Sequence, residues 1–323
     1  MLYFALPLSP PCLPQSPGCP ARAARDGLLR LRRRVGVAVL AAVATVAALA
    51  GCISRPEAPR LQPAGGTIAA ATATATRVDA LLPADALLIG EQHDAAEHQQ
   101  IEQQVVAHLA GRGMLAAVAL EMADAGTSTA ALKPSSTEEQ TRAALKWEEA
   151  GWPWAAYGPA VMAAVRAGVP VLGANLPRAQ MRGSLSDVKL DVQLPGPALK
   201  AQQQLIRSGH CDLLPESQIT PMTRIQIAKD MAMAKTIEAA ALPGKVVVLL
   251  AGNGHVNRQL GVPQHLPVTL HAKTVHLRAG EASGKDSAFD ATWPTPTLPE
   301  KDYCAGLKEQ LSGKGGAGAM NRP

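Results

Sequence analysis

The sequence predicts an α/β fold with a mostly parallel sheet that helices cover on both faces. Short, continuous apolar runs alternate along the chain with longer segments of helical period. Runs that are apolar at every position are typical of parallel strands, because both faces of such a sheet are buried. Ligands of open α/β sheets bind beyond the carboxyl ends of the strands, so we expect the site at that edge.

Each element is predicted from its own pattern. Four buried strands are predicted at 86–89, 116–120, 169–174 and 246–251, and 268–277 alternates in the manner of an edge strand. Apolar residues at helical spacing indicate three helices between them: Ile101, Val105, Val106 and Leu109; Val161, Ala164 and Val165; Ile225, Ala228, Met231 and Ala232. Residues 79–278 therefore form one domain of ordinary size.

Residues 1–51 have the build of a bacterial lipoprotein signal peptide. The basic stretch 30–34 precedes an apolar run, 35–50, that is too short to span a bilayer comfortably. The run ends at Leu49-Ala50-Gly51-Cys52, so we expect a lipid anchor, with palmitate, on Cys52. Ile53 is not the aspartate associated with inner-membrane retention, which predicts the outer membrane, on its periplasmic face. We attribute the long stretch before the signal to a start codon placed too far upstream.

The segments that flank the domain are predicted to be irregular. Residues 52–78 hold prolines, glycines and an Ala-Thr tract without amphipathic period, which predicts a lipidated tether. Residues 279–323 are rich in Gly, Pro and Lys, and we expect a partly disordered tail. After export and lipidation, Cys211 and Cys304 are left in an oxidising compartment, which favours one disulfide over two buried free thiols.

The net charge of +5 belongs to the export signal. Residues 1–51 hold six arginines and one aspartate, and residues 52–323 hold 25 basic and 25 acidic residues. A neutral mature chain lacks the basic footprint of a nucleic-acid-binding protein. We therefore exclude nucleic acid as a partner.

Four predicted strands each deliver polar groups to the same edge. The residues that follow them are Gly90-Glu91-Gln92-His93, Glu121, Asn175 and Gly252-Asn253-Gly254-His255. Glycine before each histidine lets the backbone turn sharply and approach a ligand. Two histidines and two carboxylates at one edge can bind a divalent metal, polarise a carbonyl, or hold the iron and propionates of a haem. A single buried histidine more often satisfies a carbonyl, but the pair favours a functional site.

Two further features bear on the site. His98 lies near the core-facing side of the first helix, where it either joins the site or is a boundary histidine. Aromatic residues make up 3% of the chain, yet Trp147, Trp152, Trp154 and Tyr157 fall close together. They suit packing against a planar ligand or a partner chain, or form a small aromatic core under a loop. A Tyr157 phenolate is also a candidate ligand for ferric iron.

Seven blocks, in order, resemble the ChaN family of haem-binding uptake lipoproteins, part of a superfamily with Tiki and TraB-type proteins. They are 88–94, 119–122, Trp147 with 151–157, 174–178, 209–211, Gln226 with 229–232, and 251–255 with 261–263. The resemblance implies a periplasm-facing haem-binding lipoprotein with a tyrosine as iron ligand, and a homodimer that encloses two haems. Tyr157 is the only tyrosine inside the blocks.

The resemblance also implies which residues contact haem. They are Tyr157, His93, His98, Glu121, Asn175, Arg178 and His255, of which Tyr157, His93 and His255 are the candidate iron ligands. Two positions depart from the family pattern. The family often has adjacent histidines where this chain has His98-Gln99, and often has arginine where this chain has Lys229. Either change weakens a contact to a propionate, the second only mildly, because lysine also pairs with carboxylates.

The wider superfamily supplies an alternative of a different class, since it includes metal-dependent proteases with paired Gly-x-x-His motifs. In that reading His93, His255 and Glu121 hold Mn²⁺, Co²⁺ or Zn²⁺, and Glu91 is the general base of a hydrolase. The sequence leaves the choice between a haem-binding protein and an enzyme open.

Overall fold

The structure is a computed structural model, and it describes residues 64–281 and 286–308. The predicted signal peptide, the lipidation site Cys52 and the end of the predicted tail lie outside the described residues. Within the described ranges no helix is long and apolar enough to cross a membrane.

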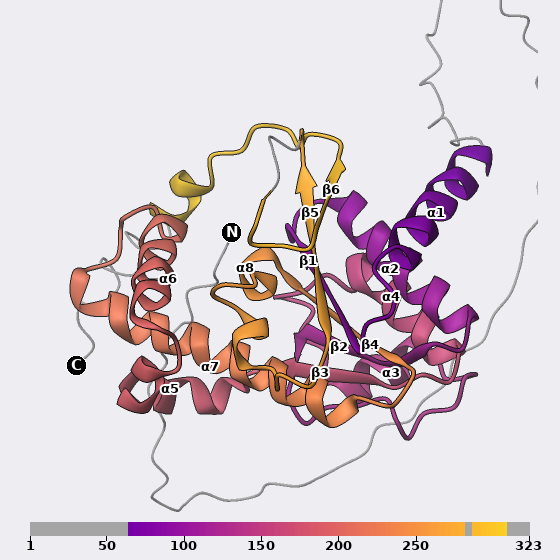
Figure 1. The fold of residues 1–323 in the computed structure, drawn as a ribbon, viewed down its shortest axis with the longest axis horizontal. Helices are drawn as coiled ribbons and strands as arrows, with labels where there is room; N and C mark the ends of the chain where they lie inside the picture. Colours follow the sequence, from indigo (N-terminus) through magenta and orange to yellow (C-terminus); the bar gives the residue numbers. More distant parts are fainter. Residues whose placement is uncertain (1–63, 282–285, 309–323) are drawn as a thin grey trace, which may run out of the picture. The chain divides into compact units, whose positions relative to one another are not determined.

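The centre of the domain is a six-stranded sheet in which every pair of neighbouring strands is parallel (Figure 1). The strand order is β3-β2-β4-β1-β5-β6. The bounds are β1 Ala86–Glu91, β2 Leu115–Asp124, β3 Val171–Asn175, β4 Val246–Gly252, β5 Ala272–Ala279 and β6 Ala291–Thr295. Every residue of β1 and β4 is buried, as the continuous apolar runs predict.

Helices on one face of the sheet pack against alternate residues of the strands. Leu87 and Ile89 of β1 belong to the same core as Val105 and Leu109 of α2 and Val161 of α4. The elements of this layer are α1 Ala64–Asp79, α2 Ala96–Gly111, α3 Glu138–Leu145 and α4 Trp154–Arg166. The apolar residues that repeat at helical spacing in α2 and α4 therefore face the sheet.

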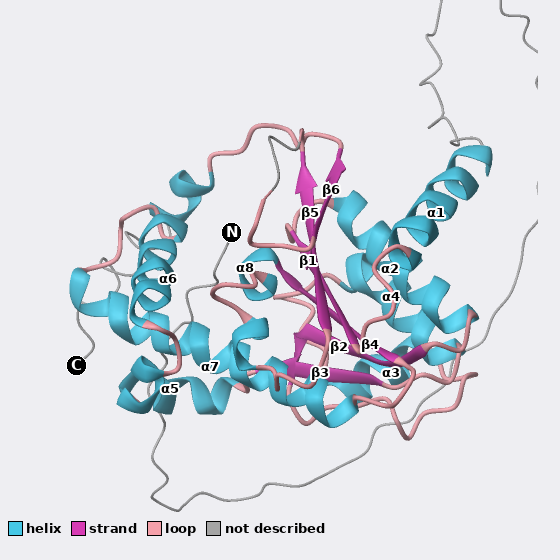
Figure 2. Cartoon of the chain, viewed as in Figure 1, coloured by secondary structure: helices cyan, strands magenta, loops and turns pink. Residues whose placement is uncertain are grey.

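The other face is covered mainly by the long helix α7, Glu216–Ala240 (Figure 2). Ala86 and Leu88 of β1 share a core with Met233 and Ile237 of α7. The first half of α7 packs with α5 Arg178–Ser186, the short helix η1 Val188–Val192 and α6 Gly196–Gly209. Short helices α8 Asn253–Val256 and η2 Val262–His265 follow β4. The predicted fold class is thus confirmed.

The expectation of an irregular tether up to residue 78 is wrong for its last part, which is the helix α1. The Ala-Thr tract carries little amphipathic signal, but the tertiary contacts with α2 stabilise the helix. The Thr74 hydroxyl donates to Gln104 Oε1 over 2.6 Å, Val78 is fully buried, and His108 of α2 contacts Asp79 at 2.8 Å.

The predicted end of the domain at residue 278 is also corrected. The last predicted strand, 268–277, is observed as Ala272–Ala279 and is not an edge strand, because β6 pairs with its outer side. Strand β6 comes from the predicted tail, and its Trp293 side chain is buried against the first helical layer. The sequence of β6 is short and contains proline, so it does not predict a strand. Pairing with β5 and burial of the Trp293 indole stabilise it.

Candidate functional site

Glu91, at the end of β1, is the centre of a buried hydrogen-bond network. Its Oε1 lies 2.8 Å from Nδ1 of His93 and accepts a 2.9 Å hydrogen bond from the Tyr157 hydroxyl. Gln99 of α2 donates to the other oxygen, Oε2. Helices α2 and α4 therefore hold the carboxylate from one face of the sheet, and the carboxylate orients His93.

Glu121, at the end of β2, holds the second histidine. Its Oε1 lies 3.2 Å from Nε2 of His255, and its Oε2 accepts a 2.8 Å hydrogen bond from the backbone N–H of Gly252. On the far side of the imidazole, Nδ1 of His255 lies 2.5 Å from Oδ1 of Asp230 and 3.1 Å from Nε2 of Gln226. Both of these residues come from α7. Because β4 lies between β1 and β2, residues from all three strands meet at this edge.

Glu121 also links the two histidines. Its Oε2 lies 3.8 Å from Nε2 of His93. The side chains thus form a continuous row, which we call the strand-end row: Tyr157, Glu91, His93, Glu121, His255 and Asp230. A Cβ atom on Gly252 would lie 2.8 Å from Nε2 of His93, so the close approach requires the glycine.

The carboxylates favour the charged form of both imidazoles. Burial lowers the pKa of His255, but the charges of Glu121 and Asp230 outweigh burial and raise it to about 9. Burial opposes the charged form of His93 as well, and the Glu91 hydrogen bond and the Glu121 charge raise its pKa above the ordinary value. For Glu121, burial is outweighed by the charge of His255, which holds the carboxyl pKa well below its usual range.

Tyr157 is held as a neutral phenol. Its side chain is 1% exposed, and burial, followed by the nearby charge of Glu91, raises its pKa above the usual range. By contrast, the side chain of His93 is 28% exposed, with its ring edge-on to Trp152 at a centroid distance of 5.0 Å. Of the two, His93 is the group that a ligand outside the domain reaches directly.

The aromatic cluster combines both roles considered from the sequence. Trp147 and Trp154 pack edge to face at 5.0 Å, and Nε1 of Trp147 donates to the carbonyl of Trp152. This part is a local core over α4. Trp152 is only half-buried and extends the cluster to His93, so the edge of the cluster lies at the site.

The other predicted contact residues lie farther along the rim. Asn175 ends β3, and its buried Oδ1 has no hydrogen-bond partner among the described residues. Arg178 is exposed at the start of α5, where its charge acts on Asp124. Lys229 of α7 is half-buried, and its charge acts on Glu121 and Asp230.

His98 lies outside the strand-end row, in the boundary position that the sequence left open for it. Its Nδ1 accepts a 2.9 Å hydrogen bond from the Gln92 N–H, and its Nε2 lies 3.0 Å from the Thr295 hydroxyl. The side chain is fully buried, and burial lowers its pKa. Both ring nitrogens are therefore occupied by structural contacts with a loop and with β6.

Two residues of α2, Gln99 and Glu102, are buried near the site; the sequence marked Gln99 only as a departure from the family pattern and did not identify Glu102. Gln99 holds Glu91, and neither carboxyl oxygen of the fully buried Glu102 has a hydrogen-bond partner among the described residues. The sequence pattern that could have identified this pair is weak: Gln99 is three residues from Glu102 and so faces the same side of the helix.

Gln226 and Asp230 are one helical turn apart on α7, and only the structure places them at His255.

The two histidines considered for a divalent-metal site are both in contact with carboxylates in this structure. Across the described ranges, no group of three or more His, Cys, Asp or Glu side chains is placed to hold a metal ion. Each imidazole is instead paired with carboxylates, with His93 between Glu91 and Glu121 and His255 between Glu121 and Asp230.

Comparison with known proteins identifies the family. The model of the haem-binding uptake family ChaN, of the Tiki superfamily, matches residues 77–266, which is more than half of the chain. The chain belongs to this family. The match includes every residue of the strand-end row, and it confirms the resemblance read from the sequence, with haem as the family's ligand. It ends before β5 and β6.

One solved structure agrees with the assignment to ChaN, and two others are more distant. ChaN of Campylobacter jejuni, with cofacially bound haem, is 26% identical, with a TM-score of 0.56 over 66% of this chain and 89% of that one. The type III effector HopBA1 is 17% identical, with a TM-score of 0.42 over 69% of this chain and 93% of that one. A Bacillus cereus protein is 14% identical, with a TM-score of 0.35 over 70% and 73%. No curated protein sequence matches the chain.

Proposed function

We propose that this chain is a lipid-anchored, periplasm-facing protein that binds haem at the strand-end row and takes part in haem or iron uptake. The observation that carries the proposal is the partly exposed imidazole of His93 beside Trp152, at the carboxyl edge of a sheet with the ChaN fold. Haem brings an iron atom that takes nitrogen or phenolate ligands, and two anionic propionates.

The residues present fit such a ligand at an open edge rather than in a deep pocket. Two cavities of about 260 and 180 Å³ lie along α2 and α4, and neither is lined by His93, Glu121 or His255. Both are smaller than the roughly 300–1,000 Å³ that is usual for a drug-sized ligand. We propose that a planar ligand rests against His93 and Trp152 at this edge, where a second protein surface can enclose it.

A second copy of the chain is our candidate for that surface. The C. jejuni relative binds haem cofacially, and an arrangement in which two haems stack between two copies covers both ligands. The half-buried Trp152 suits such an interface, because tryptophan is enriched where chains meet. We propose that haem loading and dimer formation accompany one another.

Two side chains, His93 and Tyr157, are our alternative candidates for the iron ligand. His93 presents its imidazole at the surface, whereas Tyr157 binds iron only if its hydroxyl leaves Glu91 and loses its proton. Arg178 and Lys229 are the proposed partners of the propionates, since both are cationic residues on helices near the rim.

The lipid anchor is proposed on Cys52, at the inner leaflet of the outer membrane. The lipobox 49–52 supports it, and the disulfide between Cys211 and Cys304 fits an oxidising compartment. Labelled palmitate should appear in the wild-type protein in cells and be absent from Cys52→Ser. Equal labelling of the two proteins would contradict the anchor.

Hemin titration of the purified mature chain tests the central proposal. We expect a saturable Soret band, with affinity about tenfold lower or worse in His93→Ala. His108→Ala is the matched control, because His108 lies on α2 and contacts Asp79 rather than the site. A changed Soret band in Tyr157→Phe with normal affinity in His93→Ala would assign the iron to the phenolate instead. Failure of the wild-type chain to bind hemin would overturn the proposal.

A further inference from the structure

The loop after β1, which carries His93, is supported by β6 through the buried ring of His98. Gln92 N–H donates to Nδ1 of His98, so the ring proton of the neutral imidazole is on Nε2. That N–H then donates to the hydroxyl of Thr295, 3.0 Å away, and the hydroxyl in turn donates to the carbonyl of Arg278. A chain of hydrogen bonds therefore connects the backbone of the loop to the end of the sheet.

A second support comes from the segment after β6. The hydroxyl of Tyr303 donates a 2.8 Å hydrogen bond to Oδ2 of Asp94 and accepts one of 3.2 Å from Nε2 of Gln92. Nζ of Lys301 lies 3.3 Å from the same Asp94 oxygen. Gln92 and Asp94 are the residues on either side of His93. One phenol thus bridges the two neighbours of the exposed histidine.

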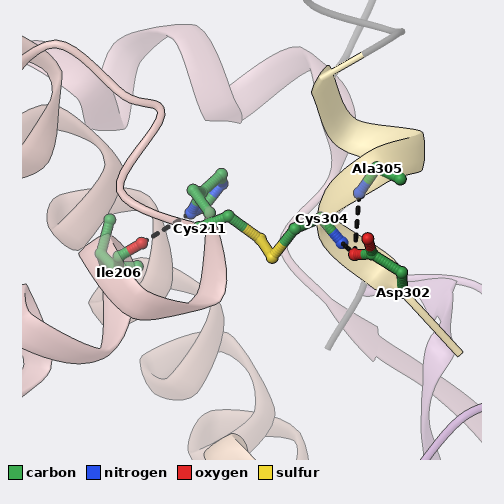
Figure 3. Close-up of a disulfide and its surroundings, with 6 residues drawn as sticks. Ile206, Cys211, Asp302, Cys304 and Ala305 are labelled. Carbon is green, nitrogen blue, oxygen red and sulfur yellow. Dashed lines mark hydrogen bonds between the residues drawn. A yellow bond between two sulfur atoms is a disulfide. The ribbon is translucent and has the colours of Figure 1, made fainter. Parts of the chain in front are cut away.

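The position of Tyr303 is held by a disulfide. Cys304, the next residue, is bonded to Cys211 just after α6, with 5.7 Å between the Cα atoms (Figure 3). As Figure 3 shows, Oδ1 of Asp302 accepts hydrogen bonds from the N–H groups of Cys304 and Ala305, which orders the turn. The buried side chain of Leu307 holds the segment beyond it.

We propose that residues 291–308, the C-terminal clasp, position His93, with Tyr303 as the positioning residue and Cys211–Cys304 as the bond that keeps it in place. This inference rests on the proposed function, because it concerns how the haem-binding histidine is held. Besides these contacts, the His93 ring is held by Glu91, and the Ala95 N–H donates a 2.9 Å hydrogen bond to the carbonyl of Gln92. The carbonyl of His93 accepts only a 3.4 Å hydrogen bond from Gln99, and Asp94 is exposed.

The positioning is measured first without haem. The edge-on contact with Trp152 at 5.0 Å shifts the ¹H signals of the His93 ring, and His93→Gln identifies those signals in the NMR spectrum. We expect the His93 signals to move in Tyr303→Phe, which keeps the ring and loses only the hydroxyl, and in the Cys211→Ser/Cys304→Ser double variant. Glu300→Gln is the matched control, since Glu300 is an exposed residue of the same segment.

Hemin titration of the same variants completes the experiment. We expect the dissociation constant to rise about fivefold or more in Tyr303→Phe and in the double variant, and to stay unchanged in Glu300→Gln. Unmoved His93 signals in both variants would overturn the clasp. Moved signals with unchanged hemin affinity would overturn its role in haem binding. Moved signals in a chain that never binds hemin would support the clasp and reject the proposed function.

Discussion

Oε1 of Glu121 lies 3.2 Å from Nε2 of His255, and this contact joins the ends of two adjacent strands in a buried ion pair. The second carboxylate, Asp230, contacts the other ring nitrogen. One histidine is therefore fixed between groups from β2 and α7. Neutralising either carboxylate should affect both stability and the site.

Glu121→Gln should destabilise the fold by about 3–5 kcal/mol, because it leaves a buried charged imidazole with one partner fewer. Glutamine keeps the shape of the side chain and an oxygen that can accept from the Gly252 N–H. Urea unfolding measures the change. Glu97→Gln, at a partly buried position in the first turn of α2, is the control, with an expected change below about 1 kcal/mol. Equal effects of the two substitutions would argue against the ion pair.

Stability should fall as the pH rises from about 6.5 to about 9. The pKa of His255 is raised from 6.5 to about 9, so in this window the folded chain binds more protons than the unfolded chain. The contribution of the charged His255 to stability is complete below pH 6.5, and it is lost as the pH rises through about 9. Asp230, whose pKa burial raises to about 6, is mostly ionised at the lower end of this window and fully ionised at the upper end.

Titration of His255 can lower the free energy of unfolding by at most about 1.4 kcal/mol per pH unit. Denaturant unfolding at several pH values between 6.5 and 9 measures this slope. His93 adds a slope of the same sign, because its pKa is also raised. In His255→Gln the slope should become shallower. An unchanged slope in that variant would show that His255 is not the group responsible.

Gly252→Ala should impair hemin binding with little effect on stability. The added Cβ would lie 2.8 Å from Nε2 of His93 and displace that side chain, while the backbone of Gly252, at φ −62° and ψ 149°, is open to any residue. We expect the free energy of unfolding to change by less than about 1 kcal/mol. Hemin titration and urea unfolding of the same sample measure both effects.

Gly183→Ala is the matched control for that substitution. Gly183 lies in α5, and no atom lies within 4 Å of the position that its Cβ would take. Alanine should stabilise the helix by about 0.5–1 kcal/mol and leave hemin affinity unchanged. Equal hemin affinity in Gly252→Ala and Gly183→Ala would mean that the position of His93 does not limit binding.

Glu102→Gln should stabilise the protein at neutral pH. Burial, followed by the charges of Glu91 and Glu121, raises the pKa of Glu102 well above 4.5, so the folded chain keeps it protonated while the unfolded chain ionises. Stability linked to this group is therefore lost as the pH rises above that value. We expect a gain in the free energy of unfolding near pH 7.5 and none near pH 4. A gain that is the same at both values would exclude ionisation as the cause.

The strand-end residues Glu91, His93, Glu121 and His255 could be predicted because each follows an apolar run that only a buried parallel strand explains. The disulfide of Cys211 and Cys304 was expected from cysteine counting, and the structure contains it. Helix α1 and strand β6 could not be predicted. Neither has a periodic pattern of its own, and contacts with α2 and β5 stabilise them.

The sequence by itself determined which residues reach the carboxyl edge of the sheet and in which order, because burial leaves a local pattern. The tertiary structure decided which of them meet. The insertion of β4 between β1 and β2 brings His255 to Glu121, α7 adds Asp230, and β6 turns His98 away from the site. These contacts join segments that are distant in the chain, and no periodicity records them.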